Sequence, residues 1–177
     1  MTARLSDASV ADIDAVSALA ARTFPLACPP ELGPVAIRAF IAEHLGPEAF
    51  RAHLVTPGHE VLVARGDDGE MVGYILLIAG TEMDPGCAGQ VIHRPTTGVS
   101  KFYVDPDHHG GGIASDMLDE VCRRCRAAGT RSIWLATNVA NARARRFYVK
   151  RGFEPRGNRT FDVGGVANTD VVYELGL

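Results

Sequence analysis

Apolar residues recur along this chain with two periods, one typical of helices and one typical of strands. Between Ser9 and Pro25 they fall three or four residues apart, which is the spacing of one helix face. These positions are Ile13, Val16, Leu19 and Ala20. Ser9-x-x-Asp12 before them is typical of a helix start, and Pro25 predicts the helix end. Residues 35–45 and 48–54, separated by Gly46-Pro47, predict two shorter helices.

Shorter, continuous apolar runs predict strands at residues 59–64, 71–79, 99–104 and 131–136, from 153 onward and at 170–175, with a weaker candidate at 1–7. Gly66-Asp67-Asp68-Gly69 predicts a hairpin between the first two of these strands. Helical spacing returns at residues 113–129 and 141–150, whereas residues 80–97 predict a long loop. An antiparallel hairpin, then β-α-β-α, then a terminal pair predicts an α/β (α+β) fold with a mixed sheet.

Composition narrows the class of protein. A chain of 177 residues, 46% hydrophobic and 22% charged, suits a single domain over residues 1–177. The net charge of -3 and the lack of a basic block argue against a nucleic-acid partner. No apolar run approaches the roughly 20 residues of a membrane span, and the first twenty residues are too acidic for a signal peptide. We therefore expect a cytoplasmic protein without a membrane partner.

The cysteines and histidines do not predict a metal site. Cys122 and Cys125 form a C-x-x-C, but they lie deep in a predicted helix and no second pair follows at zinc spacing. We predict that both occupy the helix face. His108 and His109 lack a recognisable third ligand, so we expect them to be exposed turn residues and expect no metal.

A junction of strand, turn and helix is the strongest chemical signal. Phe102-Tyr103-Val104 runs into Asp105-Pro106, the cluster Gly110-Gly111-Gly112 follows, and a helical pattern starts at Ile113. Bare backbone N–H groups at a helix start, aided by the helix dipole, can hold a phosphate without a basic side chain. A dinucleotide fold is disfavoured because the next strand ends in Thr137-Asn138 rather than in an acid, and no Gly-Lys-Ser/Thr of a Walker loop follows.

A second segment, residues 138–153, identifies the family that the chain resembles. It fits the pattern Asn-x-x-Ala-x-x-Phe/Leu-Tyr-x-x-x-Gly-Phe through Asn141, Ala144, Phe147, Tyr148, Gly152 and Phe153. His109-Gly110-Gly111-Gly112-Ile113-Ala114 fits Gln/Arg-x-x-Gly-x-Gly/Ala, apart from His109 in the first place. With both signatures the chain resembles the GNAT superfamily of acetyl-CoA-dependent N-acetyltransferases. Because the cradle is mostly main chain, we expect phosphate binding to survive the change at His109.

The resemblance implies a central mixed, mostly antiparallel sheet of about seven strands flanked by about four helices, with strands 4 and 5 splayed to admit acetyl-CoA. It also implies the cofactor-binding residues. These are Phe102, Tyr103, Val104, His109, Gly110, Gly111, Gly112, Ile113, Ala114, Ser115, Asn138, Asn141, Ala144 and Tyr148. Asn141 suits the cap of its own helix equally well.

Tyr148 matches the family position that acts as general acid. When an amine attacks a thioester, the leaving thiolate needs a proton or hydrogen bond, which a tyrosine hydroxyl can donate. The alternative is that Tyr148 is an aromatic residue packed with Phe147.

The sequence leaves open which group is the general base, the group that takes a proton from the attacking amine. Many relatives carry a Glu where this chain has Ser100. A water chain, an amine that binds in its neutral form, or another acid could serve instead. The acids that are candidates by location are Glu31, Glu82, Asp84 and Asp105. A ping-pong route through Cys87 would need a base partner, so we favour direct transfer in a ternary complex.

The acceptor is expected to bind between residues 24–54 and the 80–97 loop. Residues 159–165 and 169–172, with Thr23-Phe24, are loosely similar to a bacterial branch that includes polyamine acetyltransferases. A small primary amine of polyamine type is therefore favoured. The alternatives are a protein N-terminal or lysine acetyltransferase and a non-catalytic acyl-CoA-binding regulatory module. Dimers are common in the family, so a homodimer is compatible with the resemblance, with the last strand as a contact edge.

Overall fold

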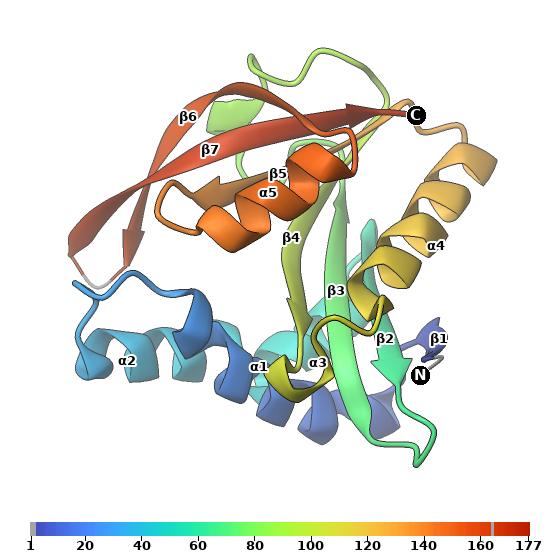
Figure 1. Cartoon of the computed structure of the whole chain (residues 1–177), viewed down its shortest axis with the longest axis vertical. Coiled ribbons are helices and arrows are strands. Elements are labelled where there is room, and N and C mark those ends of the chain that lie inside the picture. Colours follow the sequence, from blue (N-terminus) through green and yellow to red (C-terminus); the bar gives the residue numbers. More distant parts are fainter. Residues whose placement is uncertain (1–2, 164) are drawn as a thin grey trace.

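The computed structural model of the chain describes residues 3–163 and 165–177, and its centre is one twisted sheet (Figure 1). Seven strands lie in the order β1-β2-β3-β4-β5-β7-β6. They are β1 (Arg4–Asp7), β2 (His59–Arg65), β3 (Met71–Ala79), β4 (Thr96–Val104), β5 (Ser132–Asn138), β6 (Glu154–Val163) and β7 (Val166–Gly176). Neighbouring strands are antiparallel except for the parallel pair β4 and β5. The predicted mixed, mostly antiparallel sheet is confirmed; of the predicted first strand, residues 1 and 2 lie outside the described part.

Each segment with helical spacing forms a helix. The helices are α1 (Ile13–Ala27), α2 (Pro34–His44), α3 (Pro47–Val55), α4 (Ile113–Ala127) and α5 (Ala142–Lys150). Short 3-10 turns precede α1, interrupt the 80–95 loop and follow β4, at Val10–Asp12, Pro85–Cys87 and Pro106–His108. Within residues 3–163 and 165–177, no helix has both the length and the apolar character that crossing a membrane requires.

The two faces of the sheet carry separate cores. Along β2, Val61 and Val63 belong to an apolar cluster with α1 and α3, whereas Leu62 and Ala64 belong to a second cluster with α4. This alternation is the period-2 pattern of a strand that is buried on both faces. Helices α1 and α3 therefore cover one face of the sheet, and α4 covers the other.

The strands β4 and β5 separate part-way along their length. They pair only over Thr96–Val99 and Ser132–Leu135, and β4 then runs on as far as Val104. Just past the separation, Leu76 of β3 pairs with Lys101 and Leu77 pairs with Val99. Ser100 is thus the extra residue of a β-bulge, which bends β4 away from β5. The predicted splay between strands 4 and 5 is present and opens the sheet at this point.

The first helix is longer than its sequence suggests. Pro25 was expected to end α1, but the helix continues to Ala27. A proline has no backbone N–H, so it removes one hydrogen bond from a helix. In the last turn this destabilises the helix little, because few further residues depend on that turn. The predicted end at Pro25 is therefore wrong by two residues.

The last strand is not an edge of the sheet. β7 lies between β5 and β6, so the edges are β1 and β6 (Figure 1). Asp170 to Glu174 of β7 are all buried, which explains why β7 rather than β6 pairs with the centre of the sheet. The expected role of the last strand as a dimer contact edge is therefore wrong, and the homodimer itself stays a prediction.

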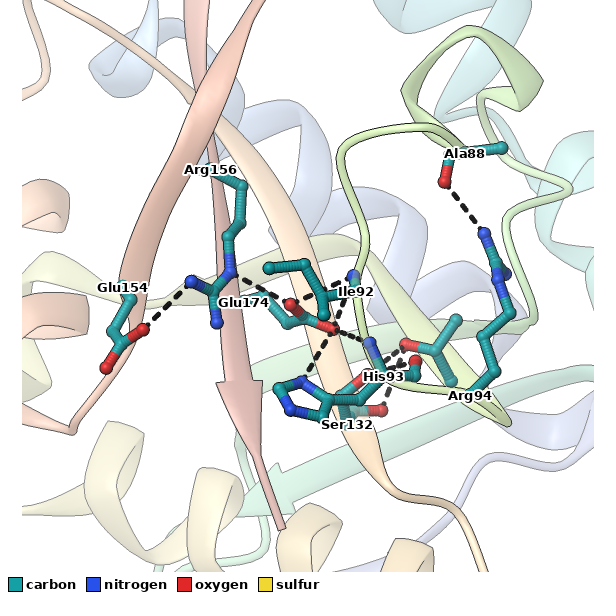
Figure 2. A network of polar contacts seen from close by, with 9 residues as sticks. Ala88, Ile92, His93, Arg94, Ser132, Glu154, Arg156 and Glu174 are labelled. Carbon is teal, nitrogen blue, oxygen red and sulfur yellow. Dashed lines mark hydrogen bonds and ion pairs between the residues drawn. The ribbon is translucent and has the colours of Figure 1, made fainter.

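A buried carboxylate fastens the long loop to β7 (Figure 2). Glu174 is 0% exposed and accepts hydrogen bonds from the backbone N–H groups of Ile92 and His93. The guanidinium of Arg156 contacts the same carboxylate at 2.9 Å. Burial alone would raise the pKa of Glu174, but these hydrogen bonds lower it. The 80–95 loop is thus held in place over its second half.

Candidate active site

A cavity of about 600 Å³ opens where β4 and β5 separate. Residues 99–103 of β4 and 135–138 of β5 form two of its walls, and Asn141, Ala144 and Tyr148 close it from the side of α5. Segments 24–32, 40–45 and 49–53 of α1 to α3 contribute the opposite wall. The expected contribution of residues 24–54 is therefore present. Of the described residues in the 80–97 loop, only Met83 lines the cavity.

The predicted site residues fall into two groups. Six of them line the cavity: Phe102, Tyr103, Asn138, Asn141, Ala144 and Tyr148. The other predicted residues are Val104, at the end of β4, and residues 109–115, which form the turn and the start of α4. Phe102 and Tyr103 connect the two groups along the chain, because β4 leads directly into the turn.

Two glycines in this turn have a backbone conformation that other residues rarely adopt. The φ angles are +84° at Gly110 and +86° at Gly112, and Gly112 is the N-cap of α4. A Cβ added at either position would meet no atom within 4 Å. Glycine is therefore required here by backbone strain rather than by crowding. The first N–H groups of the 15-residue α4 have no partner within the helix and remain available to an anion.

His109 connects the end of β4 to α5. Its Nε2 lies 2.8 Å from the carbonyl oxygen of Val104, and its Nδ1 lies 2.5 Å from Nη1 of Arg143. Since a guanidinium can only donate, we assign Nδ1 as the acceptor and place the proton on Nε2, which donates to Val104. The residue that departs from the signature is thus part of a polar link between strand and helix. His109 is exposed, as expected for a turn residue, whereas His108, for which exposure was also expected, is half-buried.

Asn141 caps α5. Its side-chain oxygen accepts a hydrogen bond from the backbone N–H of Ala144 at 3.1 Å. The capping role predicted for Asn141 is confirmed, and its contact with a cofactor stays a prediction.

Tyr148 is packed on its sides and open toward the cavity. It is 8% exposed, and its ring centroid lies 5.5 Å from that of Phe147 and 5.4 Å from that of Phe153. Burial, with a smaller contribution from Tyr103, raises the pKa of Tyr148 above that of an ordinary tyrosine. The hydroxyl therefore stays protonated at neutral pH and is a permanent hydrogen-bond donor. The predicted packing with Phe147 is present, and it is compatible with the acid role.

Comparison with known proteins decides the family. Residues 19–153 match the Acetyltransferase (GNAT) family. The chain belongs to this family. It is 38% identical over 161 residues to an uncharacterized N-acetyltransferase of Mycobacterium tuberculosis, a match that covers 91% of this chain and 95% of the relative. The protein is accordingly an acyltransferase.

Solved GNAT structures share the fold. The PaiA N-acetyltransferase from Thermoplasma acidophilum, solved in complex with coenzyme A, superposes over 100% of both chains with a TM-score of 0.77 at 18% identity. The spermidine/spermine N-acetyltransferase SpeG from Vibrio cholerae superposes over 99% of this chain and 95% of its own with a TM-score of 0.67 at 16% identity.

The acids that sequence reasoning offered as general bases of this acetyltransferase lie outside the cavity lining. Glu31 and Glu82 are exposed. Asp84 and Asp105 each cap a short 3-10 turn and each pair with an arginine. These four residues therefore act in local structure or face solvent.

Two other carboxylates line the cavity of this GNAT enzyme, Glu43 and Asp170. Glu43 lies at the mouth, with a side chain that is 75% exposed. Asp170 is 5% exposed, and its Oδ2 accepts hydrogen bonds from Arg159 at 3.2 Å. Burial raises the pKa of Asp170, and Arg159 offsets part of that rise. Sequence reasoning missed Asp170 because only the pairing of β5 with β7 brings it opposite Asn138.

Lys101 also lines the cavity and was missed. Burial lowers the pKa of Lys101 to about 8. Its signal in the sequence was a charged residue inside an otherwise apolar strand. The side chain of His53, from α3, lines the same space, and burial, Lys101 and His59 together lower the pKa of His53 to about 4, so His53 is neutral at pH 7.

The cysteines have different surroundings from those expected of a nucleophile. Cys87 is 1% exposed, packs with Val91, Trp134 and Val172, and has a pKa raised mainly by burial. Cys28 lines the cavity instead, but burial also raises its pKa. Both are therefore thiols rather than thiolates at neutral pH.

Cys122 and Cys125 lie on the buried face of α4, as predicted. Within the described residues, no group of three or more His, Cys, Asp or Glu side chains is arranged to hold a metal ion.

Proposed function

We propose that this enzyme transfers an acetyl group from acetyl-CoA to a primary amine of a small molecule, by direct attack in a ternary complex. The observation that carries the proposal is that the cavity at the separation of β4 and β5 has Tyr148 in its lining. A donor that is protonated at neutral pH thus lies beside a cavity lined by β4, and β4 continues along the chain into the glycine turn that is our candidate for the anion site.

The binding site for acetyl-CoA would have two parts. The N–H groups at Gly110 to Gly112 and at the start of α4 suit the pyrophosphate. Around Phe102 to Val104, β4 pairs with β3 but no longer with β5, so its edge toward β5 offers backbone donors and acceptors to the amide groups of the pantetheine arm, as an added strand would. When bound, acetyl-CoA supplies an activated acyl group.

The transfer step requires two proton movements. The amine nitrogen forms a bond to the acyl carbon and the bond from that carbon to sulfur breaks. Tyr148 donates its hydrogen bond, and then a proton, to the leaving sulfur. The attacking amine loses a proton at the same stage, because the product is a neutral amide.

Asp170 is our candidate for the group that takes the proton from the amine. It is the buried carboxylate of the cavity lining, and a raised pKa brings a carboxylate closer to the range in which general bases are efficient. Arg159 donates to Oδ2, and in this proposal Oδ1 is the atom that accepts the proton of the amine. Asp170 would thus supply the carboxylate that this chain lacks at Ser100, the position at which many relatives carry a Glu.

The remaining alternatives differ in what they need from the site. A ping-pong route needs an activated cysteine, and the buried surroundings of Cys87 and Cys28 oppose one. A regulatory acyl-CoA-binding module would not need Tyr148 beside the cavity. A polyamine acceptor is favoured by the similarity of the C-terminal segments but opposed by the positive charge of Lys101 in the cavity lining. A protein acceptor would have to place its amine inside a cavity of about 600 Å³. The free cysteines fit a reducing, cytoplasmic setting.

The decisive experiment measures release of free CoA thiol from acetyl-CoA over a panel of amines: spermidine, several amino acids and their amides, an aminoglycoside and a short peptide. Acceleration by one class supports direct N-acetylation and identifies the acceptor class. Tight binding of acetyl-CoA without acceleration by any amine would favour the regulatory module. Failure to bind acetyl-CoA would overturn the proposal.

A further inference from the structure

Lys101 projects from the part of β4 that faces the acceptor side of the cavity. Residues of β4 alternate between the two cores: Phe102 and Val104 pack in the cluster with α4, whereas Tyr103 packs in the cluster with α1 and α3. Lys101 has the same parity as Tyr103 and pairs with Leu76, a member of the α1 and α3 cluster. The charge of Lys101 also acts on His53 of α3. Lys101 therefore lies between the sheet and the wall made by α1 to α3.

The other charges around the cavity are compensated or exposed. Arg159 forms ion pairs with both Asp84 and Asp170. Glu43 lies at the exposed mouth, 3.7 Å from His44. For Lys101, the described residues provide no carboxylate within ion-pair distance. Within the described part of the chain, Lys101 is thus a half-buried cation of the cavity lining that has no carboxylate as a counter-charge.

The wall facing Lys101 combines an apolar, aromatic surface with the imidazole rings of His44 and His53. Phe24 and Phe40 stack with ring centroids 4.6 Å apart, and Leu32 and Leu45 continue the surface. A cavity of about 600 Å³ is of the size that holds a small ligand rather than a folded partner. Such walls favour an acceptor with a bulky apolar part.

We propose that Lys101 binds a carboxylate of the acceptor, so that the preferred substrate is a small amine that carries a carboxylate and an apolar side chain, as an amino acid does. This inference rests on the proposed acetyl transfer and names its substrate class. An ammonium group that is partly removed from water loses part of its hydration free energy. A bound carboxylate would offset much of that loss by its electrostatic attraction to the ammonium. A polyamine, which carries only positive charge, would be repelled by the same group.

The test compares amino acids with their own amides, which keep the amine and side chain but lose the negative charge. For phenylalanine and phenylalaninamide, and for the leucine and tryptophan pairs, we take the ratio of kcat/KM of the acid to kcat/KM of the amide. In Lys101→Gln we expect this ratio to fall by about 10-fold or more, which is the size of a lost charged hydrogen bond. The kcat/KM of the amides should change by less than about 2-fold. Lys101→Arg should keep most of the preference.

Lys150→Gln is the matched control, because it removes one positive charge from an exposed position on α5. Its ratios should equal those of the unchanged enzyme. The inference would be overturned if Lys101→Gln had the same ratios as the enzyme without substitutions. It would also be overturned if the enzyme without substitutions acetylated spermidine or the amides in preference to every acid. Either result would leave the proposed acetyl transfer intact. If acetyl-CoA binds but no amine of the panel is acetylated, the proposed function fails as well. Thermal unfolding of each variant separates a loss of binding from a loss of fold.

Discussion

The two walls of the cavity are built in different ways. The wall assigned to acetyl-CoA begins in the cavity with Phe102 and Tyr103 and continues beyond it through residues 104–115, and its chemistry is mostly that of the main chain. The wall assigned to the acceptor collects side chains from distant segments, including Phe24, Phe40, Lys101 and Asp170. Backbone groups present the same donors whatever the side chains are, whereas each side chain can be replaced singly. One wall can therefore stay constant while the other sets the choice of substrate.

Tyr148 lies where the two walls meet, and changing it should have the largest effect. Tyr148→Phe removes the donor to the leaving sulfur and should lower kcat by about 100-fold, within the range of general acid catalysis. The dissociation constant of acetyl-CoA should change by less than about 2-fold, because the ring packing is kept. Steady-state kinetics and titration with acetyl-CoA measure both quantities.

Tyr173→Phe provides the matched control for Tyr148. Tyr173 is a buried neighbour of Tyr148, with ring centroids 6.3 Å apart, and its hydroxyl accepts a hydrogen bond from Arg145. Its kcat should stay near that of the unchanged enzyme. An equal loss of kcat in both variants would show that packing, rather than the Tyr148 hydroxyl, is responsible.

Gly112→Val tests the main-chain wall. Valine at a φ of +86° is strained by about 1–3 kcal/mol, and relief of that strain would move the N–H groups of the turn. Acetyl-CoA should bind about 10-fold or more weakly, measured by titration calorimetry. Gly111→Ala is the control, because Gly111 has no positive φ and its added Cβ would lie at an ordinary 3.5 Å from the carbonyl oxygen of His108. Normal acetyl-CoA affinity in Gly112→Val would refute the cradle.

The pH dependence of kcat/KM in Asp170→Asn tests whether Asp170, in the acceptor wall, is the general base. The carboxylate can accept a proton only when ionised, so activity through Asp170 is present above its pKa and is lost as the pH falls through that value. Since burial raises this pKa above the ordinary 3.8, the acid limb of kcat/KM should lie above pH 3.8. Asp170→Asn should lower kcat by about 10-fold near neutral pH and regain activity as the amine deprotonates by itself at higher pH. A profile of the same shape in both enzymes would exclude Asp170 as the base.

Cys87→Ala should have the smallest effect on catalysis. Cys87 lies outside the cavity lining, so kcat should remain within about 2-fold, whereas loss of its buried sulfur should lower the free energy of unfolding by about 1–2 kcal/mol. Loss of activity without loss of fold would revive the ping-pong route. Cys28→Ala, in the lining, should instead change the KM of the acceptor.

The two walls also differ in how far the sequence predicts them. The glycine turn, the strand before it and the Asn141 cap depend on neighbours within a few residues, so local spacing was sufficient to find them. Lys101 was overlooked because its direction depends on the bulge at Ser100, and Asp170 because its place depends on the insertion of β7 beside β5. The acids chosen by sequence location lie outside the cavity lining, and two of them, Asp84 and Asp105, cap local turns. Long-range register, rather than residue type, limited the prediction.

The insertion of β7 between β5 and β6 has a consequence for synthesis on the ribosome. β5 is made before β7 and has an open edge on that side until residues 166–176 have emerged and paired with it. Asp170 and Glu174 arrive with the same strand, so the acceptor wall and the fastening of the 80–95 loop are completed together. Until its last strand is in place, the nascent chain lacks Asp170 and Glu174 and exposes an unpaired edge of β5, the kind of edge that can pair with other chains.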